Sequence, residues 1–156
     1  MNKMKPPKFK ARKGQVDFTN IRWVPVINCV VSHKDTILLV QRNKDMHLYP
    51  GYWNGISGFL DDSKSLAEKV CEELQEEIGL DKKEVISIKL GQVFDQDAPK
   101  YGKTWIVHPV LVKVSTDKIK LDWEAQNYKW VKVKDIRKID VLPGFDKIVE
   151  SFNLLK

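Results

Sequence analysis

The sequence predicts an α/β (α+β) fold in which helices cover both faces of a mixed β-sheet. Short segments rich in β-branched and other apolar residues recur along the chain, as is typical of strands. Two further segments, one central and one C-terminal, have the patterns of helices. Strands, one helix, more strands and a closing helix, in this order, favour a sheet packed between helices.

The first predicted elements form a hairpin. Residues 24–32 are apolar and rich in β-branched side chains, and residues 36–41 continue after a turn at 33–35. These two segments indicate antiparallel neighbours. A loop over 43–51 then leads to a short strand at 53–59.

A helix is predicted to follow and to end at Gly79. Asp61, Asp62 and Ser63 are the expected caps at its start, because short polar side chains accept hydrogen bonds from the first free amides. Glycine suits the end of the helix, since it readily adopts the left-handed conformation. Apolar side chains recur every four residues and predict one buried stripe, which consists of Leu66, Val70, Leu74 and Ile78.

The C-terminal half is predicted to complete the sheet and to add the second helix. Strands are expected over 84–94, 104–114 and 128–133. The polar segment 95–103 is interpreted as a loop between the first two of them. A last helix is expected over 145–152, after the break at Pro143 and Gly144.

Length, composition and charge are typical of one soluble globular domain with a basic tail. The chain has 156 residues, of which 42% are apolar and 31% are charged. Of its 27 basic residues, six lie in residues 1–16 without an acidic one, so the other 21 balance the 21 acidic residues. We therefore predict a flexible tail over 1–16 and a single domain over 17–156. A solvated tail is the preferred interpretation, and nucleic acid is not an expected partner.

The location of the protein is predicted from its N-terminus and its cysteines. Apolar runs are far shorter than a membrane span, and no apolar segment follows the basic N-terminus as it would in a secretory signal. Cys29 and Cys71 are expected to be free thiols rather than a disulfide. These features favour a cytoplasmic protein without a membrane partner.

Glu73, Glu76 and Glu77 give the clearest functional signal. At positions i, i+3 and i+4 they share one face of the predicted helix, where like charges repel and do not stabilise it. Mg²⁺ would reverse that repulsion, because it prefers carboxylate oxygens and shares its shell with water and substrate phosphates. A solvated acidic face is the alternative interpretation.

The stretch 58–80 resembles the Nudix box, the signature of hydrolases that cleave a diphosphate linked to another group. The pattern reads Gly, five residues, Glu, seven residues, then Arg-Glu-apolar-any-Glu-Glu-any-Gly-apolar. This chain matches it at Gly58, Glu73, Leu74, Glu76, Glu77, Gly79 and Leu80. The resemblance implies a Nudix-like α/β/α sandwich with a mixed sheet over most of the chain. It also implies that the three glutamates bind Mg²⁺ or Mn²⁺, with the backbone carbonyl of Gly58 as a further ligand.

Two positions depart from that pattern, and their charges change in opposite directions. Lys64 stands where the pattern has its first Glu, and Glu72 stands where it has Arg. In the family these two positions form a structural ion pair, so the resemblance implies a pair with exchanged charges. A decayed box with little activity is the competing interpretation, against which the retained glutamates and glycines argue.

The reaction that the resemblance implies is attack of water on phosphorus, helped by metal ions that offset the charge of the diphosphate. Glu73 and Glu76 are the catalytic candidates, and Glu76 is the default general base. The family also takes this base from other loops, and the candidates there are Asp95, Asp97 and Glu124. Each of these three has the alternative of being a plain surface acid.

Candidates for substrate binding lie outside the box. Arg42, at the end of the second strand, is expected to meet a phosphate or else to form a surface salt bridge. Most of the aromatic residues are expected in the core, and one or two of them on the substrate, where a ring can stack on a base. The candidates are Trp53, Phe94, Tyr101, Trp105 and Trp123.

The leading functional hypothesis is a Mg²⁺-dependent hydrolase that cleaves the diphosphate linkage of a nucleoside diphosphate derivative or a nucleotide triphosphate. An enzyme like isopentenyl-diphosphate isomerase is the second, but residues 54–57, after Trp53, lack the cysteine that such enzymes place there. A catalytically weak nucleotide-sensing or interaction module is the third. Family members often pair, so a homodimer is an expected state, although the sequence leaves the oligomeric state open.

Overall fold

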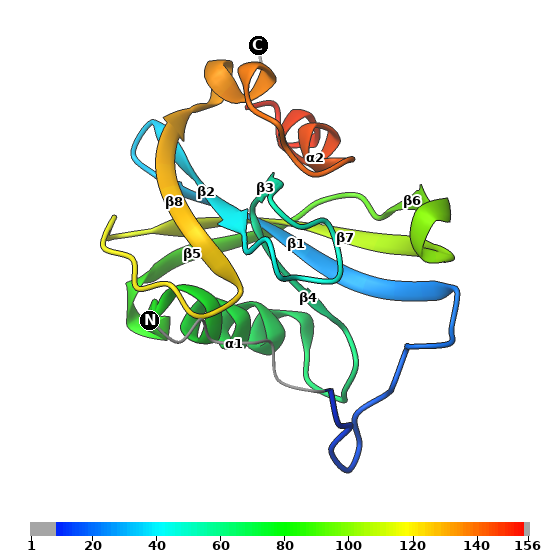
Figure 1. The fold of residues 1–156 in the computed structure, drawn as a ribbon. Helices are drawn as coiled ribbons and strands as arrows, with labels where there is room; N and C mark the ends of the chain where they lie inside the picture. Colours follow the sequence, from blue (N-terminus) through cyan, green and yellow to red (C-terminus); the bar gives the residue numbers. More distant parts are fainter. Residues whose placement is uncertain (1–8, 155–156) are drawn as a thin grey trace, which may run out of the picture.

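A computed structural model describes residues 9–154 and confirms the predicted fold class (Figure 1). The strands are β1 (Trp23–His33), β2 (Thr36–Arg42), β3 (Trp53–Asn54), β4 (Ile56–Phe59), β5 (Val85–Leu90), β6 (Phe94–Ala98), β7 (Lys103–Val114) and β8 (Ala125–Lys132). They form one eight-stranded mixed sheet with the path β3-β2-β1-β7-β5, in which β4 pairs with β1, β6 with β7 and β8 with β2. The β1–β7 pair is parallel and the other pairs are antiparallel.

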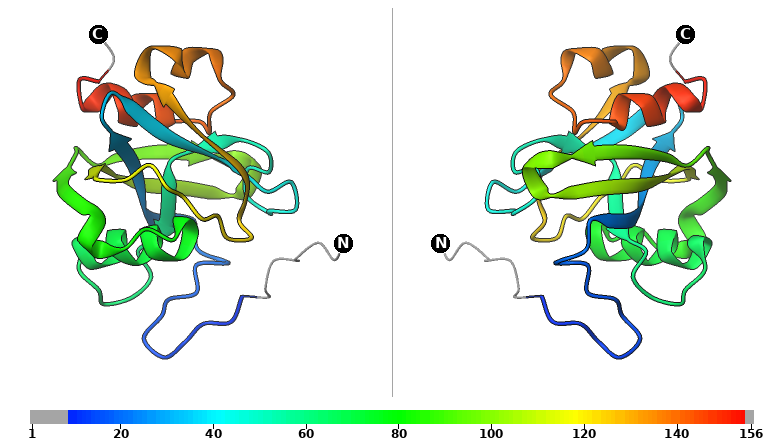
Figure 2. Two further views of the ribbon diagram at one scale, coloured as in Figure 1. Left: turned by 90° about the vertical axis from the view of Figure 1, so that its left-hand side faces the viewer. Right: turned by 90° about the vertical axis from the view of Figure 1, so that its right-hand side faces the viewer.

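Helices cover both faces of this sheet, as predicted. The α-helices are α1 (Leu66–Ile78) and α2 (Phe145–Ser151), and the 3₁₀ helices are η1 (Lys82–Glu84), η2 (Pro99–Tyr101) and η3 (Val133–Lys138). Figure 2 shows α1 and α2 on opposite sides of the sheet. Within residues 9–154, no helix is long and apolar enough to cross a membrane.

Each face of the sheet carries its own hydrophobic cluster. The cluster beneath α1 includes Ile27, Cys29, Val31, Val70, Leu74 and Ile78. The cluster beneath α2 includes Val24, Val30, Leu39, Phe145, Ile148 and Val149. Alternate residues of β1 enter opposite clusters, as successive side chains of a strand must. Full burial of one such side chain contributes about 1.5–3 kcal/mol, so both helices are firmly attached to the sheet.

The start of α1 differs from the prediction, and its end agrees with it. The residues predicted as caps, Asp61, Asp62 and Ser63, do not cap it. Ser65 is the N-cap, and it exchanges hydrogen bonds with Glu68 in a capping box. The Ser-x-x-Glu spacing makes this reciprocal pair available, whereas the earlier residues lie too far before the first turn. Gly79 has the left-handed conformation, with φ of 64°, and ends the helix as predicted.

The predicted strand 84–94 and the predicted loop 95–103 were both wrong in their bounds. The strand ends at Leu90: the Gly91 amide still donates a hydrogen bond to the Pro109 carbonyl at 2.8 Å, but Pro109 has no amide hydrogen with which to continue the ladder. A second strand, β6, then occupies the start of the predicted loop. The long strand β7 has room for two partners, and it pairs with β5 along one half and with β6 along the other.

Residues 53–59 form two short strands rather than one. The break falls at Gly55, where a Cβ atom would lie 2.9 Å from the Phe145 ring and 3.0 Å from Asn28 Oδ1. Beyond it the chain changes neighbours, since β3 pairs with β2 and β4 pairs with β1. This change brings β4, which carries Gly58, beneath α1.

Part of the predicted basic tail contacts the domain. The Val16 amide donates to the Asp61 carbonyl at 2.6 Å, and Gln15 Nε2 donates to Asp61 Oδ2 at 2.8 Å. Contacts with the loop before α1 therefore begin ahead of the predicted boundary at residue 17. Residues 1–8 of the predicted tail lie outside the described residues.

Candidate active site

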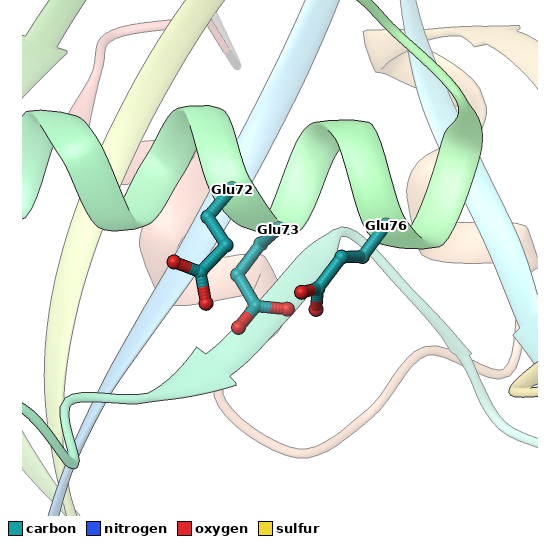
Figure 3. A group of neighbouring side chains, drawn as sticks. All are labelled: Glu72, Glu73 and Glu76. Carbon is teal, nitrogen blue, oxygen red and sulfur yellow. The ribbon is translucent and has the colours of Figure 1, made fainter. Parts of the chain in front are cut away.

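Three glutamates converge on one face of α1 (Figure 3). Carboxylate oxygens of Glu72, Glu73 and Glu76 lie within 4.8 Å of one another. Figure 3 shows the Glu76 carboxylate turned toward that of Glu73. The helix brings them together because residues three and four apart share one face. The group contains two of the predicted metal ligands, Glu73 and Glu76, and adds Glu72.

Gly58 provides the space that the Glu73 side chain needs. It lies on β4, opposite Ile27 of β1. A Cβ atom at residue 58 would lie 2.5 Å from the Glu73 carboxyl carbon, whereas carbon atoms pack at about 3.5–4.0 Å. A glycine is therefore required where the backbone of β4 passes the glutamates of the helix.

The packing of these carboxylates opposes their ionisation. Burial, together with the charges of Glu76 and Glu124, raises the pKa of Glu73 to about 8. Burial and the neighbouring Glu72 also raise the pKa of Glu76, although Lys69 and Arg12 act in the opposite direction. Carboxylates in such mutual repulsion are stabilised in their charged form by a nearby cation.

The same side chains fit a hard divalent cation. Mg²⁺ binds oxygen at about 2.0–2.1 Å, so two ligands on opposite sides of one ion lie about 4.2 Å apart. The glutamate oxygens lie within 4.8 Å of one another, which is close to that separation. Carboxylates are also the ligand type that Mg²⁺ and Mn²⁺ prefer.

Glu77 faces a small cavity beside this group. The cavity has a volume of about 20 Å³, and Arg42, Asp122 and Glu124 are among its other lining residues. Burial, then Glu124 and Glu73, raise the pKa of Glu77 well above its ordinary value. Burial lowers the pKa of Arg42, while the charges of Glu77 and Glu124 favour its protonated form. The cavity therefore brings two predicted residues, Arg42 and Glu124, to the third predicted metal ligand.

The sheet register explains this meeting. Arg42, at the end of β2, pairs with Ala125 at the start of β8, next to Glu124. The other two base candidates lie on β6, where Asp95 is opposite Ile106 and Asp97 Oδ1 accepts a hydrogen bond from Thr104 Oγ1 at 2.9 Å. Of the three base candidates outside the box, Glu124 is the one that meets the glutamates of α1.

Most of the predicted stacking residues pack into the cluster beneath α2. Trp53, Phe94 and Tyr101 are half-buried against it. The Tyr101 hydroxyl accepts a hydrogen bond from the Tyr49 amide at 2.9 Å. Trp105 is buried, and its Nε1 donates to the Tyr49 hydroxyl at 2.9 Å. Their contacts are thus largely made within the protein.

Trp123 lies instead in an open groove next to the Glu77 cavity. The groove has a volume of about 430 Å³, and Lys44, Asp122, Trp123 and Ala125 are among its lining residues. Asp122 and Ala125 also line the Glu77 cavity, so the two spaces are neighbours. Asn43 Nδ2 donates to the Trp123 carbonyl at 3.1 Å, which joins the loops on the two sides of the groove.

The predicted structural pair belongs to a larger network. Lys64 Nζ lies 2.9 Å from Glu72 Oε2. A second lysine, Lys69, lies 3.5 Å from Glu72 Oε1 and 3.0 Å from both Asp61 Oδ1 and Asp62 Oδ2. The sequence interpretation missed this lysine. Its position could have predicted the contact, because Lys69 lies three residues before Glu72 and opposite charges at that spacing meet on a helix.

The sequence interpretation also missed Asp122. Its amide donates to the Glu77 carbonyl at 3.2 Å, and its Oδ1 accepts from the Glu124 amide at 3.0 Å. Burial raises the pKa of Asp122 to about 6, and the charge of Glu124 acts in the same direction. The hydrogen bond from the Glu124 amide acts in the opposite direction. No motif of the sequence marks this residue, because its link to Glu77 depends on how the loop before β8 crosses α1.

Comparison with known proteins gives the family. A model described as the NUDIX domain matches residues 22–152, so the chain belongs to the Nudix hydrolase family. The uncharacterized Nudix hydrolase YvcI of Bacillus subtilis is 25% identical over 128 residues, which cover 80% of this chain and 76% of that protein. The fold, the box and these matches define a pyrophosphohydrolase of the Nudix type.

Two solved structures illustrate the shared fold. An Ap4A hydrolase from C. elegans has 22% identity and a TM-score of 0.67, and the match covers 83% of this chain and 95% of that one. A bifunctional NMN adenylyltransferase/ADP ribose pyrophosphatase from Francisella tularensis has 25% identity and a TM-score of 0.65. That second match covers 81% of this chain but 39% of the larger protein.

Proposed function

We propose that this protein hydrolyses the diphosphate linkage of a nucleoside diphosphate derivative or a nucleotide triphosphate, with Mg²⁺ or Mn²⁺ as its cofactor. The observation that carries the proposal is the cluster of Glu73 and Glu76 carboxylates beside the bare backbone of Gly58. Arg42 and Glu124 add to this site, because they line the cavity that Glu77 faces. Family membership supplies the reaction class.

Glu73, Glu76 and Glu77 would hold the metal, together with the backbone carbonyl of Gly58. A bound divalent ion offsets the charge of a diphosphate and lowers the pKa of its bound water. The chain itself contributes placement, because α1 fixes the carboxylates side by side and Gly58 keeps β4 close to them. Groups fixed in advance need little reorganisation during the reaction.

Glu124 is the general base that the geometry supports outside the box. It lines the same cavity as Glu77, and its carbonyl accepts a hydrogen bond from the Asn43 amide at 2.7 Å, which holds its loop. Glu76 is the alternative within the box. Removal of the true base, by Glu124→Gln or Glu76→Gln, should lower kcat by about 10²–10⁴-fold, because general base catalysis contributes that much. If Glu124 is the base, Glu124→Gln should lower kcat and leave Mn²⁺ affinity near that of the parent, whereas Glu76→Gln should also weaken Mn²⁺ binding because Glu76 is a proposed metal ligand.

The nucleoside part of the substrate is proposed to occupy the groove at Trp123. This groove adjoins the cavity of Glu77 and is lined by the half-buried Trp123, whose indole is the type of ring on which a base stacks. Lys44 lines the groove and Arg42 lines the cavity, so these are the two cations that would contact phosphate groups among the acidic side chains of both spaces. Two related solved proteins are named for Ap4A and for ADP ribose. Both compounds combine a base with linked phosphates.

A panel of nucleotides tests the proposal. Ap4A, ADP ribose and nucleoside triphosphates are incubated with Mg²⁺, and the products are identified by chromatography. We expect cleavage at a diphosphate linkage, loss of cleavage with a chelator, and a several-fold higher KM in Trp123→Ala that Trp123→Phe largely restores. Binding of these nucleotides without cleavage of any would reject the hydrolase and favour a nucleotide sensor.

We also propose that the enzyme acts in the cytoplasm. Both cysteines of the chain, Cys29 and Cys71, are free thiols. Free thiols are usual in reducing compartments, where disulfides are rare. Cell fractionation with an antibody against the protein would test this location.

A further inference from the structure

Lys69 is a cation that α1 buries beside its glutamates. Its side chain is 4% exposed, and lysine is almost never buried to this degree unless it is paired. Its ammonium group contacts Asp61 and Asp62 from the loop before the helix and Glu72 from the helix itself. Burial favours the neutral amine, but the hydrogen bonds to Asp61 and Asp62 raise the pKa of Lys69 above its ordinary value. The charged amine therefore ties the loop to the helix.

The network continues from Asp61 into the N-terminal segment. Asp61 is buried, with one carboxylate oxygen on Lys69 and the other on Gln15 Nε2. The Gln15 side chain in turn accepts a hydrogen bond from the Arg12 amide at 3.0 Å, which closes the turn that reaches Asp61. Every oxygen of the Asp61 carboxylate is thus engaged, so the loop before α1 is held from both sides.

Glu72 explains why a buried cation is needed at this place. It puts a negative charge where the Nudix box has an arginine, and it lies in one group with Glu73 and Glu76. Lys64 contacts its Oε2 and Lys69 contacts its Oε1, so both oxygens are occupied by lysines. Each Glu72 oxygen thus has a lysine that offsets its charge beside Glu73 and Glu76.

Lys64 lies closer to Glu72 than Lys69 does, at 2.9 Å against 3.5 Å, but it is the more exposed of the two lysines. Its side chain is 40% exposed, and exposed ion pairs restrain their partners poorly. Lys69 is buried, and a buried cation that lost its partners would be strongly destabilising. Lys69 is therefore the lysine whose contacts hold the loop before α1 to the helix.

We propose that Lys69 is a positioning residue of the metal centre and replaces the missing arginine of the box. It holds the loop of Asp61 and Asp62 against α1, and it offsets the charge that Glu72 adds beside Glu73 and Glu76. The inference rests on the proposed function, since it names what keeps that site in shape. Residues that orient metal ligands in this way typically contribute about 10–100-fold to metal affinity or activity.

Variants of Lys69 in two backgrounds separate positioning from a purely structural role. Lys69→Met removes the charge and keeps the length of the side chain, and Lys69→Arg keeps the charge. Both are made in the parent and in the double variant Lys64→Glu/Glu72→Arg, which restores the charge arrangement of the box. We would measure kcat, KM and, by calorimetry, the Kd for Mn²⁺, at a temperature where circular dichroism shows every variant folded.

In the parent, we expect Lys69→Met to weaken Mn²⁺ binding and to lower kcat, each by about 10-fold, with KM little changed. Lys69→Arg should stay close to the parent. In the restored background the same loss should shrink to a few-fold, because the arginine introduced at position 72 supplies the cation. Equal losses in both backgrounds, or unchanged Mn²⁺ binding in Lys69→Met, would overturn the proposal.

The Mn²⁺ measurement also separates this inference from the proposed function. A parent that binds Mn²⁺ but hydrolyses no nucleotide would refute the hydrolase, and the comparison of Lys69 variants would still be decided by the Kd for Mn²⁺. If Lys69→Met does not fold, Lys69→Gln, which can still donate a hydrogen bond to Asp61, is compared in the same two backgrounds and judged by the same result.

Discussion

Lys64 and Glu72 form an ion pair in which Nζ lies 2.9 Å from Oε2, and their charges are the reverse of those in the Nudix box. The contact still joins the loop before α1 to the helix, as the resemblance implied. The exchange of charges also changes the surroundings of the glutamates proposed to bind metal. It places a carboxylate beside Glu73 and Glu76, and a second lysine, Lys69, lies 3.5 Å from that carboxylate.

Reversal of one charge of this pair should destabilise the protein, and reversal of both should restore much of the loss. Glu72→Arg alone places a third cation beside Lys64 and Lys69, whereas Lys64→Glu alone places two anions together. Thermal unfolding of the parent, both single variants and the double variant measures the coupling between the two sites. Strictly additive effects on the unfolding temperature would show that the two residues do not interact.

Gly58→Ala should damage the site more than it damages the fold. Its new methyl group would collide with the Glu73 carboxyl group, which must then leave its position. We expect weaker Mn²⁺ binding, by about 10-fold, together with a lower unfolding temperature. Adding Glu73→Asp, which shortens the colliding side chain, should recover the unfolding temperature but not Mn²⁺ binding. A Gly58→Ala variant with normal Mn²⁺ affinity would contradict this role for the glycine.

The raised pKa of Glu73, about 8, predicts that the metal-free protein loses stability as the pH rises. The unfolded carboxyl titrates near 4.5, so between these two values the folded state binds more protons than the unfolded state. The stability that the protonated form provides is complete below about pH 4.5 and is lost as the pH rises through about 8. The raised pKa values of Glu76 and Glu77 act in the same direction.

Unfolding temperatures from pH 5 to pH 9, measured with a chelator present, check this dependence. The decline should be smaller in Glu73→Gln, because that side chain no longer titrates. Addition of Mg²⁺ should stabilise the parent most at the alkaline end, where the carboxylates are charged. A metal-free parent that became more stable from pH 5 to pH 9 would show that the repulsion among the glutamates is unimportant.

Two deletions test the contact of the N-terminal segment with Asp61. Removal of residues 1–11 keeps Gln15 and Val16 and should leave the unfolding temperature near that of the parent. Removal of residues 1–16 deletes both hydrogen bonds to Asp61 and should cost about 1–3 kcal/mol, since one acceptor is a buried carboxylate. Equal unfolding temperatures for the two deletions would mean that the segment acts only as a solvated tail.

Local patterns predicted most of the fold, and they failed where a tertiary neighbour decides. The apolar segments indicated β1, β2 and β7, and the four-residue stripe indicated α1. By contrast, β6 is polar at Asp95, Gln96 and Asp97, and it is a strand because the long β7 offers it an edge. Pairing of that kind produces no sequence pattern from which the strand could be predicted.

The same division applies to the site. Glu73 and Glu76 belong to one helix, so their spacing was enough to predict that they share a face, and the resemblance to the Nudix box implied that Gly58 lies with them. The approach of Glu124 depends on the register between β2 and β8, and that of Asp61 to Lys69 depends on the loop before α1. Neither can be predicted from composition or periodicity, because each joins residues from separate elements.

The proposed function requires that the carboxylates of α1 bind the divalent ion with which the protein cleaves a diphosphate. The most direct test is the initial rate of hydrolysis of the best nucleotide substrate across a Mg²⁺ titration, for the parent and Glu76→Gln. Glu150→Gln, which makes the same chemical change at an exposed site on α2, is the control. We expect activity that requires Mg²⁺, a loss of about 10²-fold or more in Glu76→Gln, and none in the control. Hydrolysis that persists in a chelator, or a Glu76→Gln variant as active as the parent, would show that these carboxylates do not bind a catalytic metal ion.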